Sequence, residues 1–112
     1  MTIAPAQEFD TTPEIKYDKS GRAVMVTTYC VVNGYSLANS DTKIRPDGTY
    51  TESCFDEHHG ICRTNEPVSR ARLEELDRHN PRSISLITVL GTDRATVERH
   101  LAERKITARH IN

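Results

Sequence analysis

The stretch that decides the fold is SISLITVLGTDRATVERHLAERKI, residues 83–106, because it contains the densest apolar run in the chain. The run is bounded by Pro81 before it and Gly91 after it. A short apolar run between turn residues is typical of a strand that is buried on both faces. The sequence therefore predicts a central strand over residues 84–90. Each of its five aliphatic side chains would contribute about 1.5–3 kcal/mol by burial. These side chains are Ile84, Leu86, Ile87, Val89 and Leu90.

A helix is expected directly after this strand. Thr92 or Asp93 can cap it, and Val97 and Leu101 give it an apolar side. A last strand is predicted over residues 106–111. The order strand, helix, strand favours a right-handed crossover, which would place the last strand parallel to residues 84–90.

The first half of the chain has the alternation and turn residues of an antiparallel meander. Valine, threonine and tyrosine dominate residues 23–32, which follow a short strand over residues 15–17. Asn33-Gly34 is a strong hairpin signal, because a type I′ turn needs positive φ at both central residues. Pro46-Asp47-Gly48 predicts a second hairpin turn.

The meander is expected to end at a polar connector over residues 55–66. A first helix would then begin with Asn65 as its cap and Pro67 in its first turn, and it would end before Pro81. The predicted fold is therefore α+β. An antiparallel meander is extended by a strand-helix-strand unit into one mixed sheet, with two helices packed on a face.

The chain of 112 residues has the length of one domain. Residues 1–13 are predicted to be a flexible arm and residues 14–112 a single domain. No apolar run approaches the roughly 20 residues of a membrane span. The start of the chain lacks the basic and apolar regions of an export signal, so a cytoplasmic location is expected. Three cysteines, an odd number, are expected to be thiols in that reducing setting.

The net charge of −1 conceals an asymmetry between the two halves. Residues 1–62 carry five basic and nine acidic side chains, whereas residues 63–112 carry ten basic and seven acidic ones. The arginine-rich second half makes nucleic-acid binding a weaker alternative. Its arginines are interspersed with carboxylates and lack interleaved aromatic rings, so nucleic acid is not the expected partner.

One cluster gathers side chains that ligate metals. Cys54, His58, His59 and Cys62 lie within nine residues, and zinc takes four ligands from cysteine and histidine. The spacing differs from the paired C-x2-C pattern of common zinc modules. A zinc-stabilised interaction module built on the loop over residues 54–62 is therefore an alternative. Apart from the zinc of this alternative, no cofactor is predicted. The same cluster could hold a cysteine nucleophile beside a histidine.

The four tyrosines all lie in the acidic first half, where they could form a recognition face. Tyrosine is favoured at interface centres because it offers a large area at a low entropic cost. These residues are Tyr17, Tyr29, Tyr35 and Tyr50. The acidity around them suits a protein partner with a basic surface, and hairpin edges could also pair with a second copy as a homodimer.

The function predicted first is that of a small non-enzymatic binding protein that acts through a protein–protein interface. Lone domains of this size are common among bacterial, phage and plasmid regulators, accessory proteins and inhibitors. No stretch has the spacing of a catalytic signature, so no enzyme activity is predicted.

Overall fold

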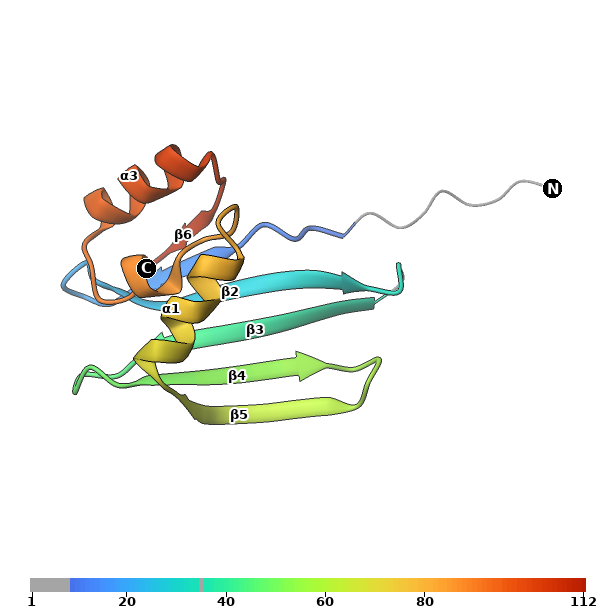
Figure 1. Cartoon of the computed structure of the whole chain (residues 1–112). Helices are drawn as coiled ribbons and strands as arrows, with labels where there is room; N and C mark the ends of the chain where they lie inside the picture. The colour runs from blue at the N-terminus through green and yellow to red at the C-terminus, as the bar shows by residue number, and fades with distance from the viewer. Residues whose placement is uncertain (1–8, 35) are drawn as a thin grey trace.

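Five consecutive antiparallel strands and a late sixth strand build one sheet in the computed structural model, which describes residues 9–34 and 36–112 (Figure 1). The meander consists of β1 (Glu14–Tyr17), β2 (Ala23–Val32), β3 (Ser36–Ile44), β4 (Tyr50–Asp56) and β5 (Ile61–Val68). It is followed by α1 (Arg70–His79), α2 (Leu86–Val89), α3 (Arg94–Arg104) and β6 (Arg109–Ile111). The strand order is β5-β4-β3-β2-β1-β6. The predicted α+β class with one mixed sheet is confirmed.

The hairpin turns follow from their residues. Asn33 and Gly34 have φ of 52° and 78°, the positive values that were predicted for this turn. They join β2 to β3, as predicted. The turn between β3 and β4 contains Gly48 with φ of 86°, which confirms the second predicted hairpin.

The predicted central strand over residues 84–90 is wrong. Most of this run forms the short helix α2, in which the Ser85 side chain accepts a hydrogen bond from the Thr88 amide at the N-terminus. Its main contacts with other elements are with α1 and α3, and none of its residues pairs with a strand. Its apolar residues are buried on several sides because the run lies between helices and the sheet. A short apolar run of this kind does not distinguish a strand from a buried helix.

The parallel pair of the sheet consequently involves other strands. β6 pairs parallel with β1, with Glu14 opposite Arg109 and Lys16 opposite Ile111. The C-terminal strand is confirmed near its predicted place, but its partner comes from the start of the meander. The predicted strand-helix-strand unit is therefore replaced by three helices and one edge strand.

The predicted polar connector over residues 55–66 is also wrong, because β4 reaches Asp56 and β5 begins at Ile61. Asn65 and Pro67 belong to β5, and α1 begins later, with Ser69 as its N-cap. Asn65 has a φ of 50° and lies where the β4–β5 register shifts. Asparagine and proline are common both at helix starts and in irregular edge strands, so these two residues indicated the wrong element.

Two predicted helix boundaries are confirmed. α1 ends with Asn80 as its C-cap, immediately before Pro81. α3 begins after Asp93, whose side chain accepts a hydrogen bond from the Thr96 amide at 2.9 Å.

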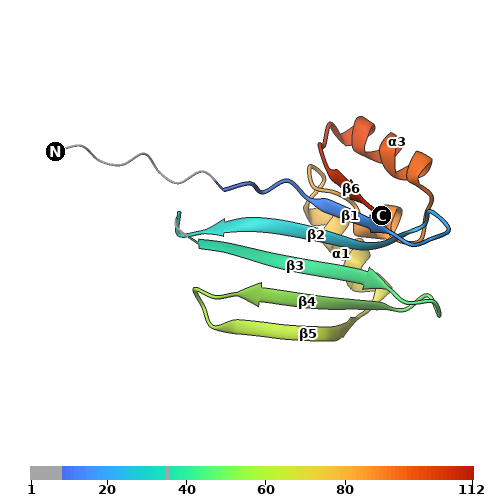
Figure 2. The same ribbon diagram turned by 180° about the vertical axis from the view of Figure 1, so that it is seen from behind.

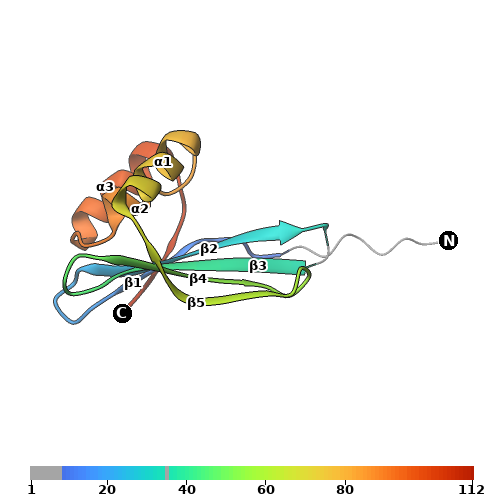
Figure 3. The same cartoon turned by 60° about the horizontal axis from the view of Figure 1, so that its bottom comes forward.

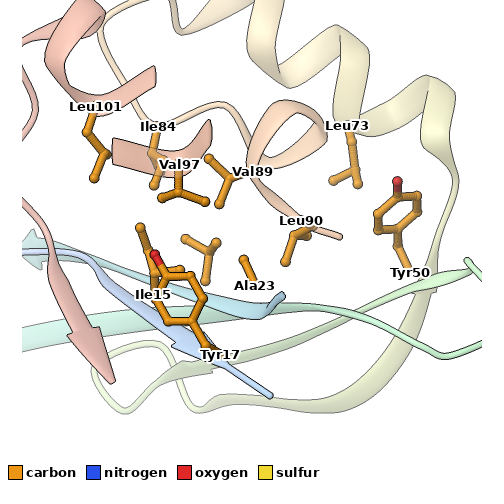
Figure 4. Close-up of a cluster of buried hydrophobic side chains, with 11 residues drawn as sticks. Ile15, Tyr17, Ala23, Tyr50, Leu73, Ile84, Val89, Leu90, Val97 and Leu101 are labelled. Carbon is orange, nitrogen blue, oxygen red and sulfur yellow. The ribbon is translucent and has the colours of Figure 1, made fainter. Parts of the chain in front are cut away.

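All three helices lie on one face of the sheet and near one end of it, whereas the other face has no helix among the described residues (Figures 2 and 3). We call the end that carries the helices the proximal half. The distal half consists of residues 29–34, 36–39 and 55–62, which include the ends of β2–β5 around the turns at Asn33-Gly34 and residues 57–60. The main core lies between the proximal half and the helices (Figure 4). It contains Ile15, Tyr17, Ala23, Val26, Tyr50, Leu73, Ile84, Val89, Leu90, Val97 and Leu101.

The predicted N-terminal arm lies partly outside the described residues, which begin at Phe9. In the described part, the Pro13 carbonyl accepts a hydrogen bond from the Arg109 amide at 2.9 Å. Asp10 forms an ion pair with the Arg109 side chain. No described helix is long and apolar enough to cross a membrane.

Candidate functional site

The strand register assigns each side chain of the meander to one face. Paired residues share a face, and successive residues of a strand alternate between faces. Ile15 pairs with Val26, and both are fully buried in the core beneath the helices. Tyr29 and Val31, three and five positions after Val26, therefore lie on the opposite face, which we call the open face.

Apolar side chains gather on the open face in the distal half of the sheet. Tyr29 and Phe55 lie in one register row, on either side of Asn39. Val31 pairs with Leu37 in the next row toward the tip. We call Tyr29, Val31, Leu37 and Phe55 the distal patch. Cys62 pairs with Phe55 and extends the row onto β5.

The distal patch contains two of the three large apolar side chains that stand out as exposed among the described residues. The exposed fraction is 43% for Val31 and 45% for Phe55, whereas Tyr29 and Leu37 are half-buried. Single exposed apolar residues are ordinary, but a cluster on one flat face marks a candidate contact surface.

Carboxylates lie in the register row beside the patch. Asp41 on β3 pairs with Thr27 and accepts a hydrogen bond from its hydroxyl at 2.7 Å. On the other side of β2, Glu14 of β1 pairs with the same Thr27. Burial, together with the negative charges of Glu14 and Asp41, raises the pKa of Tyr29 above its usual value. Lys16 and Lys43 lie one row further from the patch. The apolar surface is thus bordered first by acidic and then by basic side chains.

The structure does not bring the four predicted interface tyrosines together. Tyr17 and Tyr50 are core residues with exposed fractions of 4% and 8%. The Tyr17 hydroxyl lies 2.7 Å from His110 Nδ1, so the polar end of this buried ring is satisfied. Only Tyr29 lies on the open face, and Tyr35 lies outside the described residues. Tyr17 and Tyr50 must therefore be removed from the predicted recognition face.

The four predicted zinc ligands are also separated. Cys54 pairs with Ser40 on the helix-bearing face, whereas Cys62 pairs with Phe55 on the open face, so the two thiols point to opposite sides of the sheet. His58 and His59 lie in the turn between β4 and β5. Within residues 9–34 and 36–112, no group of three or more histidine, cysteine or acidic side chains is arranged to hold a metal ion.

The two histidines instead stabilise the tips of the hairpins. Asn33 Nδ2 lies 2.7 Å from His58 Nε2, which links the β2–β3 turn to the β4–β5 turn. His59 Nδ1 lies 2.6 Å from Asp56 Oδ2, and this hydrogen bond lowers the pKa of the Asp56 carboxyl. The imidazole rings of His58 and His59 meet edge to face. These contacts hold the distal strands in register where no described helix supports them.

Cys54 is a poor candidate for the predicted cysteine nucleophile. All three cysteines are free thiols, as predicted. Burial and the nearby Glu52 carboxylate raise the pKa of the Cys54 thiol, which makes it a poorer nucleophile at neutral pH.

Ser85, His100 and Asp77 have the residue types of a hydrolytic triad, but their geometry differs from one. The Ser85 amide, not its hydroxyl, donates to His100 Nε2 at 3.0 Å. The Ser85 side chain is fully buried and caps α2. A nucleophilic serine needs an accessible hydroxyl that is bonded to the base. The three residues therefore form a structural link between the helices.

The arginines of the second half lie next to carboxylates. Arg70 pairs with Glu74 at 3.1 Å, and Arg94 pairs with Glu98 at 3.0 Å, each along one helix. Arg104 pairs with Asp77 across two helices at 2.8 Å. Mixed surfaces of this kind lack the basic excess of a nucleic-acid interface.

The edge of β5 is poorly suited to pairing with another strand. Pro67 has no amide proton, and the irregularity at Asn65 interrupts the strand. In natural proteins, proline and irregularities of this kind keep edge strands from pairing with strands of other molecules. A homodimer made by joining two β5 edges is disfavoured by this geometry.

Val31, Leu37 and Phe55 were not among the sequence-predicted site residues. The alternation of Tyr29 and Val31 within β2 was a usable signal, since it placed both on one face. The missing information was which face the helices would leave open.

Comparisons with protein-family models, with curated proteins and with solved structures find no significant match to this chain.

Proposed function

We propose that this protein is a small protein-binding domain without catalytic activity, and that it binds its partner through the distal patch. The observation that supports this proposal is the exposure of Val31 and Phe55 beside Tyr29 and Leu37 on a sheet face that no described helix covers. Burying such side chains against a partner contributes about 25 cal/mol per Å² of apolar surface.

The residues around the patch indicate the chemistry of the partner. Glu14 and Asp41 border it, and Glu14 lies 3.6 Å from Arg109 as an ion pair, which leaves Asp41 as the less neutralised charge. We propose that the partner inserts an apolar or aromatic side chain at Phe55 and places a lysine or arginine near Asp41. Charge pairing at the rim favours the correct partner mainly through orientation and association rate.

The proposed biological role is regulatory, as an accessory protein or an inhibitor that occupies a surface of its partner. The reducing cytoplasm is the proposed setting, in keeping with three free thiols. An anchor of one or two rings on a small patch gives a modest affinity, because association itself costs several kcal/mol.

The proposal is tested by selecting binding peptides from a random library against the protein, and then measuring their affinity for two variants by titration. Phe55→Ser removes the most exposed ring of the patch. Arg63→Ser is the matched control, because Arg63 is exposed on the neighbouring strand β5 but pairs with Cys54 on the opposite face.

We expect the selected peptides to share an apolar residue close to a lysine or arginine. Phe55→Ser should weaken their binding at least tenfold, roughly the loss of one interface anchor. Arg63→Ser should change it less than about twofold, since exposed side chains outside an interface have small effects. Peptides that bind Phe55→Ser as well as the unaltered protein would contradict the proposal.

A further inference from the structure

The segment over residues 80–85, which we call the strap, connects α1 to α2 and separates two hollows. One hollow, of about 200 Å³, is lined by side chains of α1, including Leu73 and Asp77. The other, of about 220 Å³, is lined by residues that include Pro13 and Ile106. Thr28, Ser83 and Ile84 line both hollows. Ser83 and Ile84 therefore form the wall between them.

Two side chains of α3 hold this wall in place. Arg104 Nη1 donates to the Ser83 carbonyl oxygen at 2.8 Å. His100 Nε2 accepts from the Ser85 amide at 3.0 Å. The exposed fraction is 7% for His100 and zero for Ser85, so water does not readily replace the second bond. The strap is thus attached to α3 by two hydrogen bonds. The Arg104 guanidinium makes one of them and the His100 imidazole makes the other.

The Ser85 contact requires a neutral imidazole. A nitrogen that accepts an amide hydrogen carries no proton, so His100 holds its proton on Nδ1. Protonation of Nε2 would place two donors opposite each other and remove this bond. We propose that the strap is a proton-controlled latch, in which protonation of His100 frees the Ser85 end and lets the wall between the two hollows move.

The charges around His100 set the pH at which this happens. Burial and the Arg104 cation lower the pKa of His100, while Asp77 on α1 and Glu103 on α3 oppose that shift. The net lowering keeps the imidazole neutral at pH 7 and the latch closed. The latch contribution is fully present above the unfolded histidine pKa of about 6.5, and it is lost as the pH falls through the lower folded value.

Asp77 provides a second position for the protonated ring. Its Oδ1 is buried and lies 2.8 Å from Arg104 Nη1 as an ion pair. Burial opposes the charge of this carboxyl, but hydrogen bonds from the Arg104 and Ser85 side chains and the positive charges of Arg104 and His100 lower its pKa. A protonated His100 can donate to an oxygen of this kind. The device therefore has two arrangements, one with Nε2 bonded to the Ser85 amide and one with an imidazolium attracted to Asp77.

Hydrogen exchange of single amides tests the latch in the full chain at about pH 7.5 and about pH 5, with rates corrected for intrinsic exchange. We expect the protection of the Ser85 amide to fall at least tenfold at the lower pH. The Val26 amide in the core of β2 is the internal control and should keep its protection. Equal losses at both amides would indicate global unfolding and would overturn the proposal.

Two variants sharpen the test. His100→Gln replaces the imidazole by a carboxamide whose oxygen accepts a hydrogen bond but does not titrate, so protection at Ser85 should become independent of pH. His79→Gln is the matched control, because His79 is exposed at the end of α1, and it should behave like the unaltered protein. If His100→Gln does not fold, nitrogen NMR of the unaltered protein decides. A proton on Nε2 at about pH 7.5 would overturn the latch.

Discussion

The proximal and distal halves of the sheet share the same strands but differ in what covers them. In β2, Ala23 and Val26 are fully buried under the helices, whereas Val31 near the other end is 43% exposed. No described helix covers the distal half on either face (Figure 3). We therefore expect the proximal half to supply most of the folding free energy and the distal half to supply the proposed contacts with a partner.

The difference follows from the lengths of the elements. β2 has ten residues and β3 has nine, so each spans about 30 Å at a rise of about 3.3 Å per residue. The ten residues of α1 and the eleven of α3 span only about 15 Å each, at 1.5 Å per residue. Helices of this length cannot cover the strands from end to end.

Two leucines provide the largest test of this comparison. Leu73 on α1 is 1% exposed in the core, and Leu37 on β3 is half-buried in the distal patch. Leu73→Ala should lower the free energy of unfolding by about 2–5 kcal/mol, because it leaves a cavity in the core. Leu37→Ala should lower it by about 1 kcal/mol or less. Urea denaturation of both variants measures the difference.

Equal losses of stability in these two variants would contradict the division into a stabilising half and an exposed half. The slope of the unfolding transition serves as a control, since it should stay unchanged if both variants unfold from the same compact state.

The sequence predicted the meander well because its signals are local. Asn33-Gly34 forces one turn geometry, and the alternation in residues 23–32 defines two faces over a short range. The segment over residues 84–90 was predicted wrongly because its apolar residues are compatible with a strand or with a buried helix. Its position between α1 and α3 determines that it forms a helix, and that position depends on contacts with residues distant in sequence.

The candidate site was less accessible to prediction for the same reason. Tyrosine content indicated a recognition surface, but burial depends on where the helices dock, and they dock over Tyr17 and Tyr50. The cluster of cysteines and histidines indicated a metal site, but the register of β4 and β5 turns Cys54 and Cys62 to opposite faces. These cysteines and histidines are close in sequence, but their side chains do not meet in the folded chain.

Two glycines with positive φ give an intermediate test. Gly34 at the distal tip has a φ of 78°, and a Cβ there would meet no atom within 4 Å. Gly91 on the proximal side has a φ of 87°, and a Cβ there would lie 3.1 Å from Ile44 Cδ1. Gly34→Ala should cost about 1–2 kcal/mol from the left-handed backbone alone. Gly91→Ala should cost about 1 kcal/mol more, because it also crowds a packed side chain.

Thermal and urea unfolding of the two glycine variants report this difference directly. A Gly34→Ala variant that is less stable than Gly91→Ala would show that the distal tip is packed more tightly than the proximal side, contrary to the comparison.

The smallest expected effect on stability is that of Phe55→Ser. Phe55 and Tyr50 are the two rings of β4, but Tyr50 is 8% exposed in the core and Phe55 is 45% exposed on the open face. Phe55→Ser should change the free energy of unfolding by less than about 0.5 kcal/mol, as is usual for surface substitutions. Tyr50→Ser is the matched variant and should destabilise strongly. A loss of more than about 1.5 kcal/mol in Phe55→Ser would mean that its ring supports the fold. If Phe55→Ser leaves the free energy of unfolding unchanged and also loses peptide binding, the Phe55 ring acts in recognition.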